Sequence, residues 1–373
     1  MKLLEFDGRL GLQQRVVPAY RRPFFETLGR SCRGGLFVFA GQPLPQEGIQ
    51  TVELLEGVEL ETGKNRHLFD PSSPFYQCRQ PGLVAWLEER QPDILVVEAN
   101  PRYPNTYQAI RWMRSRDRQV LGWGLGAPPA RGWLSGWRRN RRMKLLSQLD
   151  GLIAYSQRGA SEYQALGLPD DRVFVAPNAA SFRPQGPPPR KPDSFTGKPT
   201  VLFVGRLQAR KRVDLLLESC ARLPELLQPD LWIVGDGPAK EDLIAMASQL
   251  YPQANFPGAL HGPALDPYFD RADLFVLPGT GGLAVQQAMA HGLPIIVAQG
   301  DGTQDDLVKE ENGWQVIPGD RDDLQEALEA ALSDPALLRR MGEASYRIVA
   351  NEINLEVMVA EFIKAVNSIH ETG

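Results

Sequence analysis

Two cations that follow a short apolar segment are the residues best suited to chemistry in this sequence. Arg206 and Lys211 lie in VGRLQARKR (204–212), just before a helical pattern begins. Cationic side chains beside the N–H groups of a helix N-terminus attract the same anion. We therefore expect a phosphate or diphosphate site, in which each charge-assisted hydrogen bond contributes ~1.5–3 kcal/mol. The alternative is a solvated loop with surface arginines.

Two later segments, VGDGP (234–238) and PGTGGL (278–283), also follow apolar runs and are rich in glycine. Glycine lets a backbone approach a ligand closely, and a helix predicted from Leu283 would direct its first N–H groups at the same anion. The first segment predicts a helix from Pro238. The alternative is that these glycines only end strands. The candidate binding residues in these turns and beside Arg206 are Gly205, Gly235, Gly237, Gly279, Thr280, Gly281, Gly282 and Leu283.

The elements that must position these residues are short, continuous apolar runs, each followed by a helical pattern. Continuous hydrophobicity is typical of strands buried on both faces of a parallel sheet, and the alternation of strand and helix predicts an α/β fold. The runs lie at 36–42, 94–101, 119–128, 151–156, 172–178, 200–206, 231–238, 273–282 and 293–302.

A proline-rich stretch divides the chain. Six prolines lie between residues 181 and 199, and they disfavour both a helix and a strand ladder. We therefore expect two doubly wound domains that bind ligands at the carboxyl ends of their strands. The expected order is a first domain at 1–180, a linker at 181–198, a second domain at 199–350, and a last helix within 351–373 that packs back on the first domain.

Composition narrows the class of protein. The 373 residues are 43% hydrophobic, and no apolar run approaches the roughly 20 residues of a membrane span. The first ten residues carry charges where a signal peptide has an apolar block, and the three cysteines lack metal spacing, so we expect a cytoplasmic protein. Residues 1–198 carry 28 Lys and Arg against 19 Asp and Glu, and the remainder 13 against 26. A basic first half suits an anionic membrane, a phosphorylated acceptor or nucleic acid.

One basic segment, residues 131–144, also contains two tryptophans. Such a composition suits the inner face of an anionic membrane or a lipid-linked acceptor, and it also suits stacking on single-stranded nucleic acid. The alternative is a helix with Trp133, Leu134 and Trp137 packed inward and its arginines solvated. The candidate contact residues are Trp133, Trp137, Arg138, Arg139, Arg141 and Arg142.

Five motifs of the second half fall in a familiar order. Together they resemble the nucleotide-sugar-binding domain of family-4 glycosyltransferases of the GT-B fold. The five motifs are VGRL with its following lysine, GDGP, the glycine loop PGTGGL (278–283), AMAHGLP (288–294), and Asn312-Gly313 with Pro318-Gly319-Asp320. The resemblance covers about residues 199–350. The first half is similar mainly by architecture and by the segment from Ser156 to Pro177-Asn178.

The resemblance implies a retaining glycosyltransferase with two Rossmann-like domains. Its donor would be a nucleoside diphosphate sugar, and its acceptor a glycan or lipid-linked molecule. It would need neither a metal nor another cofactor, because Arg206 and Lys211 would stabilise the leaving diphosphate. Two alternatives are a non-catalytic partner protein and a nucleotide-sugar epimerase. A nicotinamide enzyme is disfavoured, because no G-x-G-x-x-G opens the first strand–helix turn.

The sequence departs from the resemblance at the glycine loop. The family usually has two glutamates seven residues apart, one near the donor sugar and one on the ribose. Gly279 and Gln287 stand at these positions, as in a branch with a PG-x-x-GL loop. Gln287 can still hydrogen-bond a ribose diol, whereas Gly279 offers only backbone.

The first half offers fewer candidates. Glu98 and Asn100 follow one apolar run, and Arg15 and Arg21 lie in the first loop. We assign Glu98 a catalytic role in orienting the acceptor or a sugar hydroxyl; the alternative is that it pairs with a nearby arginine. His67, the one histidine of this half, lies in a polar segment predicted as a loop. The position where the family often has a histidine falls in GWGLG (122–126), which has none.

Overall fold

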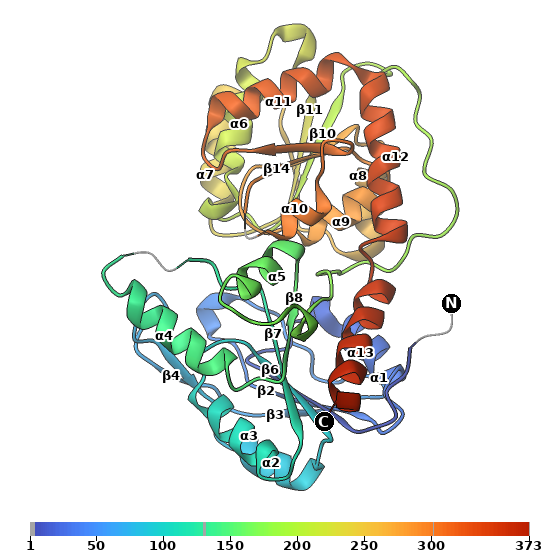
Figure 1. The fold of residues 1–373 in the computed structure, drawn as a ribbon. Helices are drawn as coiled ribbons and strands as arrows, with labels where there is room; N and C mark the ends of the chain where they lie inside the picture. Colours follow the sequence, from blue (N-terminus) through green and yellow to red (C-terminus); the bar gives the residue numbers. More distant parts are fainter. Residues whose placement is uncertain (1–3, 130–131, 301, 373) are drawn as a thin grey trace. The chain divides into compact units, whose positions relative to one another are not determined.

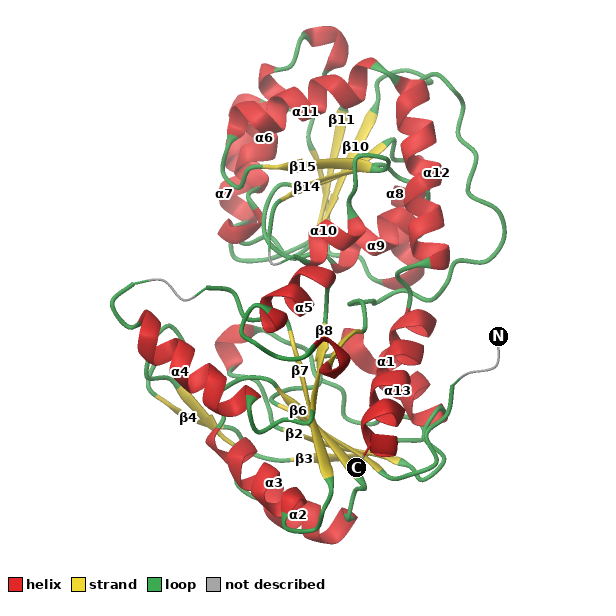
Figure 2. Cartoon of the chain, viewed as in Figure 1, coloured by secondary structure: helices red, strands yellow, loops and turns green. Residues whose placement is uncertain are grey.

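The computed structural model describes residues 4–129, 132–300 and 302–372, and its chain divides into two compact units. Unit 1 comprises residues 1–180 and 355–373, and unit 2 comprises residues 181–354. Each unit has a parallel sheet with helices packed on it (Figure 1 and Figure 2), which confirms the predicted α/β class.

In unit 1 the sheet has the strand order β3-β2-β1-β6-β7-β8-β9, and all its pairs are parallel. A separate antiparallel hairpin, β4–β5, precedes α2. The strands are β1 (Leu10–Gln14), β2 (Leu36–Ala40), β3 (Glu59–Thr62), β4 (Arg66–Leu68), β5 (Gln77–Arg79), β6 (Ile94–Glu98), β7 (Gln119–Gly124), β8 (Gly151–Ala154) and β9 (Val173–Val175). The helices are α1 (Arg22–Arg30), α2 (Leu83–Arg90), α3 (Pro104–Arg114), α4 (Ser135–Leu146), α5 (Gln157–Gln164) and α13 (Leu355–Thr372), with 3₁₀ turns η1 (Ala19–Arg21), η2 (Pro45–Glu47) and η3 (Asp170–Arg172).

In unit 2 the sheet has the order β12-β11-β10-β13-β14-β15, again with parallel pairs. Strand β10 is central, with Leu202 aligned to Trp232 on one side and Phe275 on the other. The strands are β10 (Thr200–Val204), β11 (Asp230–Val234), β12 (Asn255–Gly258), β13 (Leu274–Leu277), β14 (Ile295–Ala298) and β15 (Gly313–Val316). The helices are α6 (Val213–Arg222), α7 (Lys240–Leu250), α8 (Asp266–Arg271), α9 (Leu283–Ala290), α10 (Thr303–Leu307), α11 (Arg321–Ser333) and α12 (Pro335–Asn351), with 3₁₀ turns η4 (Ala209–Lys211), η5 (Glu225–Leu227) and η6 (Gly262–Leu265).

All nine predicted apolar runs contain a strand, because residues such as those of β2, β8 and β10 are buried on both faces of their sheets. Helix α9 begins at Leu283 as predicted, whereas α7 begins at Lys240, two residues after the predicted start at Pro238.

Helix α13 packs on unit 1, where Phe362 lies against the rings of Phe24 and Trp123 at 5.6 and 5.2 Å. The buried Arg21 contributes to the same region. Its guanidinium lies 5.6 Å from the Trp123 ring and hydrogen-bonds the Asn178 side chain. Arg21, a candidate from the first loop, therefore has a packing role within unit 1.

The proline-rich stretch is anchored to unit 2. The Lys191 ammonium donates to the carbonyl oxygens of Asp270, at 2.8 Å, and of Ala272, at the end of α8. The Tyr346 hydroxyl donates to the Gly186 carbonyl at 2.7 Å. No helix or strand occurs between residues 181 and 199, all of which are described. Burial lowers the pKa of Lys191 to about 8.

One buried ion pair ties α12 to the sheet of unit 2. Arg339 and Asp273 are 2.8 Å apart, with side chains 12% and 14% exposed, and Asp273 also accepts from the Thr200 N–H. We predict that Arg339→Ala lowers the free energy of unfolding by ~3 kcal/mol, because it leaves the Asp273 carboxylate largely buried without its cation. Denaturant titration of unit 2 measures this. Arg340→Ala, which removes the exposed neighbouring cation, should cost less than about 0.5 kcal/mol; equal losses would contradict the assignment.

Candidate anion-binding site

The loops after β10 and β11 are joined through their backbones. Gly205 N–H donates to the Val234 carbonyl at 3.0 Å, and Leu207 N–H donates to the Asp236 carbonyl at 2.9 Å. A Cβ at Gly235 would lie 1.9 Å from the Gly205 oxygen, and one at Gly237, where φ is +155°, would lie 2.3 Å from the Leu207 oxygen. These two glycines therefore let one loop approach the other.

Lys211 links the β10–α6 loop to the glycine loop that follows β13. Its ammonium donates to the Thr280 carbonyl at 2.6 Å, while the Thr280 N–H donates to the Arg210 carbonyl at 3.0 Å. The Lys211 side chain is buried, and burial together with the neighbouring Arg210 lowers its pKa to about 8. The structure thus brings together Lys211 and Thr280, two residues that the sequence predicted for one site.

Gly279 and Gly281 are required by this arrangement. A Cβ at Gly279 would lie 2.3 Å from the Arg210 carbonyl oxygen and 2.6 Å from the Lys211 Cα. At Gly281, where φ is +101°, a Cβ would lie 2.5 Å from the Lys211 Nζ. The position where a family glutamate is usual therefore has no room for a side chain, because the lysine loop packs directly against it.

The remaining predicted residues of this site lie around the same loops. Arg206 is exposed, two residues beyond the end of β10. Gly282 is the N-cap of α9, so the first N–H groups of that helix, including that of Leu283, lie at the glycine loop. Gln287 is exposed one turn further along α9. Cations and a helix N-terminus at the carboxyl ends of β10 and β13 can hold an anion such as diphosphate.

Two residues of this region were missed by sequence reasoning. Arg210 donates to the Thr280 hydroxyl at 3.2 Å, so a second cation reaches the glycine loop. Gln304 of α10 is buried, and its amide lies 3.5 Å from the Gly281 carbonyl. The signal for Gln304 was present in QGDGTQ (299–304), which overlaps the end of the run at 293–302.

In unit 1, Glu98 lies at the carboxyl end of β6, where its carboxylate accepts from the Arg15 N–H and from the Tyr103 hydroxyl. Burial raises the pKa of Glu98, although the nearby Arg15 partly opposes this. The Arg15 guanidinium pairs with Glu47 at 2.9 Å, so Arg15 meets Glu98 through its backbone. The sequence left open that Glu98 pairs with an arginine. Arg15 does contact Glu98, but through its backbone N–H and not as a side-chain ion pair.

Two other first-half candidates have local structural partners. His67 lies in β4, so its prediction as a loop residue is wrong: strand pairing with β5 aligns it with Cys78. Its Nδ1 lies 2.7 Å from the Tyr76 hydroxyl, and burial lowers its pKa. The Asn100 side chain accepts from the Arg102 N–H at 3.1 Å, which stabilises the turn after β6.

The predicted tryptophan-and-arginine segment forms α4 and the turn before it; Arg131 lies outside the described residues. Trp133 is 90% exposed, so the alternative in which it packs inward is wrong. Trp137 is 38% exposed, and Arg141 and Arg142 are half-buried. Arg141 and Arg142 each donate to a backbone carbonyl, of Pro101 and Pro128, while Arg138 and Arg139 are exposed.

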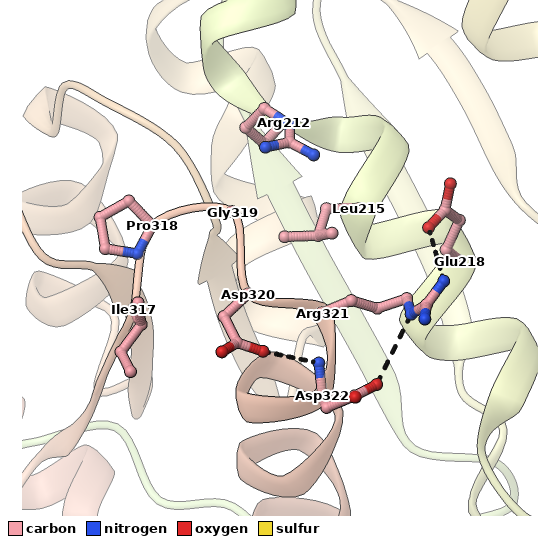
Figure 3. Close-up of a pocket in the computed structure, with 9 residues that line it drawn as sticks. All are labelled: Arg212, Leu215, Glu218, Ile317, Pro318, Gly319, Asp320, Arg321 and Asp322. Carbon is pink, nitrogen blue, oxygen red and sulfur yellow. Dashed lines mark hydrogen bonds and ion pairs between the residues drawn. The ribbon is translucent and has the colours of Figure 1, made fainter.

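A separate cavity of about 590 Å³ lies in unit 2 between α6 and the β15–α11 loop (Figure 3). Its cations are largely offset by acids. Arg321 lies 3.6 Å from both Glu218 and Asp322, and Arg212 lies 3.1 Å from Asp214. This cavity therefore has less uncompensated positive charge to attract an anion than the Lys211 loop has. The described residues contain no group of three or more His, Cys, Asp or Glu side chains arranged to hold a metal.

Comparison with known proteins supports the glycosyltransferase resemblance that the sequence predicted for the second half of the chain. Residues 188–348 match the family model of glycosyl transferases group 1. The sulfoquinovosyl transferase SQD2 of Arabidopsis thaliana is 34% identical over 154 residues, which cover 40% of this chain and 29% of the relative. A GDP-mannose-dependent alpha-mannosyltransferase of Mycolicibacterium smegmatis is 38% identical over 164 residues, covering 43% and 41%. The chain thus aligns with about half or less of these relatives' length.

Solved structures match both units. The Anabaena protein HepE in complex with UDP has a TM-score of 0.69 at 16% identity, covering 97% of this chain and all of that one. Likenesses of this kind confirm the GT-B fold. The resemblance to glycosyltransferases is confirmed at the level of the group 1 family. None of the helices among the described residues is long and apolar enough to cross a membrane.

We predict that Gly279→Ala lowers the free energy of unfolding by ~1–3 kcal/mol, because the added methyl would overlap the backbone of Arg210 and Lys211. Gly282→Ala, in the same loop, is the matched control. Its Cβ would meet nothing closer than 3.8 Å, so the loss should stay below about 1 kcal/mol. Thermal and denaturant unfolding measure both. A Gly279→Ala protein as stable as the control would refute the close packing of the two loops.

Proposed function

We propose that this chain, residues 188–348 of which match the family model of glycosyl transferases group 1, transfers a sugar from a nucleoside diphosphate donor to an acceptor. The observation that carries the proposal is the buried Lys211 ammonium. It is held by a backbone carbonyl at the start of a helix, beside Arg210. Such an arrangement favours an anion with several oxygens.

Two similar proteins support the donor class. The mycobacterial relative is named for its dependence on GDP-mannose, and HepE was solved with UDP. Both ligands contain a diphosphate, and neither decides the base or sugar used by this chain. The proposal therefore names a nucleoside diphosphate sugar without specifying either part.

In the proposed reaction, the bond between the anomeric carbon and the diphosphate oxygen breaks, and an acceptor hydroxyl forms the new glycosidic bond. Lys211, Arg206 and the N–H groups at the start of α9 offset the charge that develops on the leaving diphosphate. Fixed donors of this kind stabilise a transition state, and loss of one commonly costs ~3 kcal/mol. We propose no requirement for a metal, because these cations supply the charge that the leaving group needs. We propose retention at the anomeric carbon on the resemblance of residues 199–350 to retaining glycosyltransferases.

We propose that Glu98 holds or deprotonates the acceptor, a glycan or lipid-linked molecule. Its carboxyl is fixed by Arg15 and Tyr103, and burial raises its pKa towards the range useful for proton transfer. Gln287 is proposed to bind the ribose hydroxyls.

A non-catalytic partner protein is the second candidate function. It is favoured by one observation: Gly279 and Gln287 stand where the family resemblance implies two glutamates near the donor. A non-catalytic partner would bind a nucleoside diphosphate without turnover, whereas a glycosyltransferase would both bind the nucleotide sugar and turn it over. Incubation with nucleotide sugars, followed by analysis of released nucleotide and sugar products, separates them. Free sugar formed without an acceptor would instead favour an epimerase or hydrolase.

We predict that at least one of UDP, GDP and ADP raises the thermal unfolding temperature, since a ligand that binds the folded state stabilises it. Arg206→Ala and Lys211→Ala should each weaken binding by roughly 10- to 150-fold, the equivalent of one charge-assisted hydrogen bond. Arg222→Ala and Lys309→Ala remove cations of unit 2 that pair with acids elsewhere, and should bind as the wild type does. Equal temperature shifts in all five proteins would place the nucleotide at a different site.

We also predict that nucleotide affinity falls above pH 8. The free protein holds the Lys211 pKa at about 8, and a bound diphosphate raises it, so binding takes up a proton at higher pH. Affinity should be constant below pH 8 and decrease up to tenfold per pH unit above it. Calorimetry from pH 7 to 10 measures this. Lys211→Arg stays charged and should give a flat profile; the same slope in Lys211→Met would show that another group titrates.

A further inference from the structure

Aromatic side chains are exposed together on unit 1. Phe69 and Phe75 lie in the connection of the β4–β5 hairpin, and Trp133 and Trp137 lie at the start of α4. Trp133 is 90% exposed and Phe69 is 67% exposed. Large exposed apolar groups that gather in one place usually mark an interaction surface.

Specific contacts hold the hairpin and the helix together. The rings of Phe75 and Trp137 are 5.8 Å apart, and the Arg141 guanidinium lies 4.8 Å from the Trp137 ring centre. Arg141 also donates to the Pro101 carbonyl at 2.9 Å, and so fixes α4 to the turn after β6. Figure 1 shows α4 beside β4. The hairpin and the helix therefore present one surface.

The tip of the hairpin holds Phe69 in an unusual conformation. Its φ is +64°, in the left-handed region that bulky residues rarely adopt. Such a conformation is strained, and the exposed ring recovers little of that cost by packing within the chain. Asp70 and Ser72 maintain the turn, because the Ser72 N–H donates to the Asp70 carboxylate at 2.9 Å. The turn thus keeps an aromatic ring directed away from the core.

Charge surrounds these rings. The hairpin and the α4 region, residues 66–79 and 132–146, contain seven Lys and Arg against one acid, Asp70. Hydrogen bonds from Ser72 lower the pKa of Asp70, so this acid stays ionised and does not change the sign of the surface. We name this surface the aromatic–basic face: Phe69, Phe75, Trp133, Trp137, Arg138 and Arg139.

We propose that the aromatic–basic face docks on an anionic lipid bilayer. Aromatic rings enter the headgroup boundary, and each Lys or Arg near an anionic surface adds electrostatic attraction. At Trp137, single-stranded nucleic acid fits less well, because base stacking requires an open ring face and this ring is already in contact with Arg141 and Phe75.

Docking on lipid does not require sugar transfer. A connection between the aromatic–basic face and Glu98 rests on the proposed function. Strand β5 connects the hairpin to the turn after β6, since the Cys78 N–H donates to the Arg102 carbonyl at 3.1 Å. In the same turn, the hydroxyl of Tyr103 contacts Glu98. A bilayer at the face would place a lipid-linked acceptor on the same unit as Glu98.

Vesicle flotation tests the proposal, with phosphatidylcholine alone and with added phosphatidylglycerol. Wild type should float only with the anionic vesicles. Phe69→Ser/Trp133→Ser and Arg138→Glu/Arg139→Glu should each reduce binding about tenfold or more. Leu54→Ser/Leu226→Ser removes equally exposed apolar residues elsewhere, and Arg340→Glu/Arg347→Glu makes the same charge change elsewhere; both should bind as the wild type does.

Every substituted side chain in these four double variants is exposed, so thermal unfolding and nucleotide binding should stay unchanged and show that each protein is folded. The proposal is overturned if the wild type binds neither vesicle, if it binds both equally, or if the control variants lose as much binding as the test variants. It is also overturned if a single-stranded oligonucleotide, but not the vesicles, binds with this dependence on the face. Loss of flotation with normal turnover would leave the proposed function intact.

Discussion

The candidate site depends on one interaction, the hydrogen bond from the buried Lys211 ammonium to the Thr280 carbonyl. Removing a charge from water is costly unless it is paired. Burial and Arg210 both lower the pKa of Lys211, and no carboxylate among the described residues raises it. The loop therefore holds a cation whose charge is only partly compensated. A bound anion would restore that compensation. We therefore propose the Lys211 loop as the diphosphate site in preference to the separate cavity, whose arginines are already paired with acids.

The same packing of Lys211 against the glycine loop explains why a glycine stands at position 279, where the family resemblance implies a glutamate. A glutamate at position 279 would need space that the backbone of Arg210 and Lys211 occupies. A carboxylate there would also pair with Lys211 and reduce its attraction for phosphate. Glycine at 279 and 281 thus brings the lysine loop onto the start of α9, and Gln304 supports the loop from the other side through Gly281. The departure from the usual motif belongs to a coherent local structure.

Sequence reasoning found the strands whose side chains are buried on both sides, and the glycine and lysine positions, because continuous hydrophobicity and glycine spacing are local signals. It missed β1, an interior strand between β2 and β6, because LGLQQ ends in two polar residues. Their burial is possible because Gln13 and Gln80 hydrogen-bond across 67 residues. The contact of Arg210 with Thr280 was also missed, and the sequence left open which arginine contacts Glu98. Both depend on loops distant in sequence, and a single pattern contains no information on such contacts.

The charge asymmetry of the chain can now be reconciled with an anionic donor. The second half carries 26 acids against 13 bases, yet the proposed diphosphate site lies there. Screening confines surface charges to a range of about 8–10 Å at physiological salt, so distant acids act weakly on a bound nucleotide. Several nearby acids are also neutralised, as Asp236 is by Lys240 and Asp214 by Arg212. At the glycine loop, the cations Arg210 and Lys211 therefore set the local potential, and burial makes the field of Lys211 stronger than that of a solvated charge.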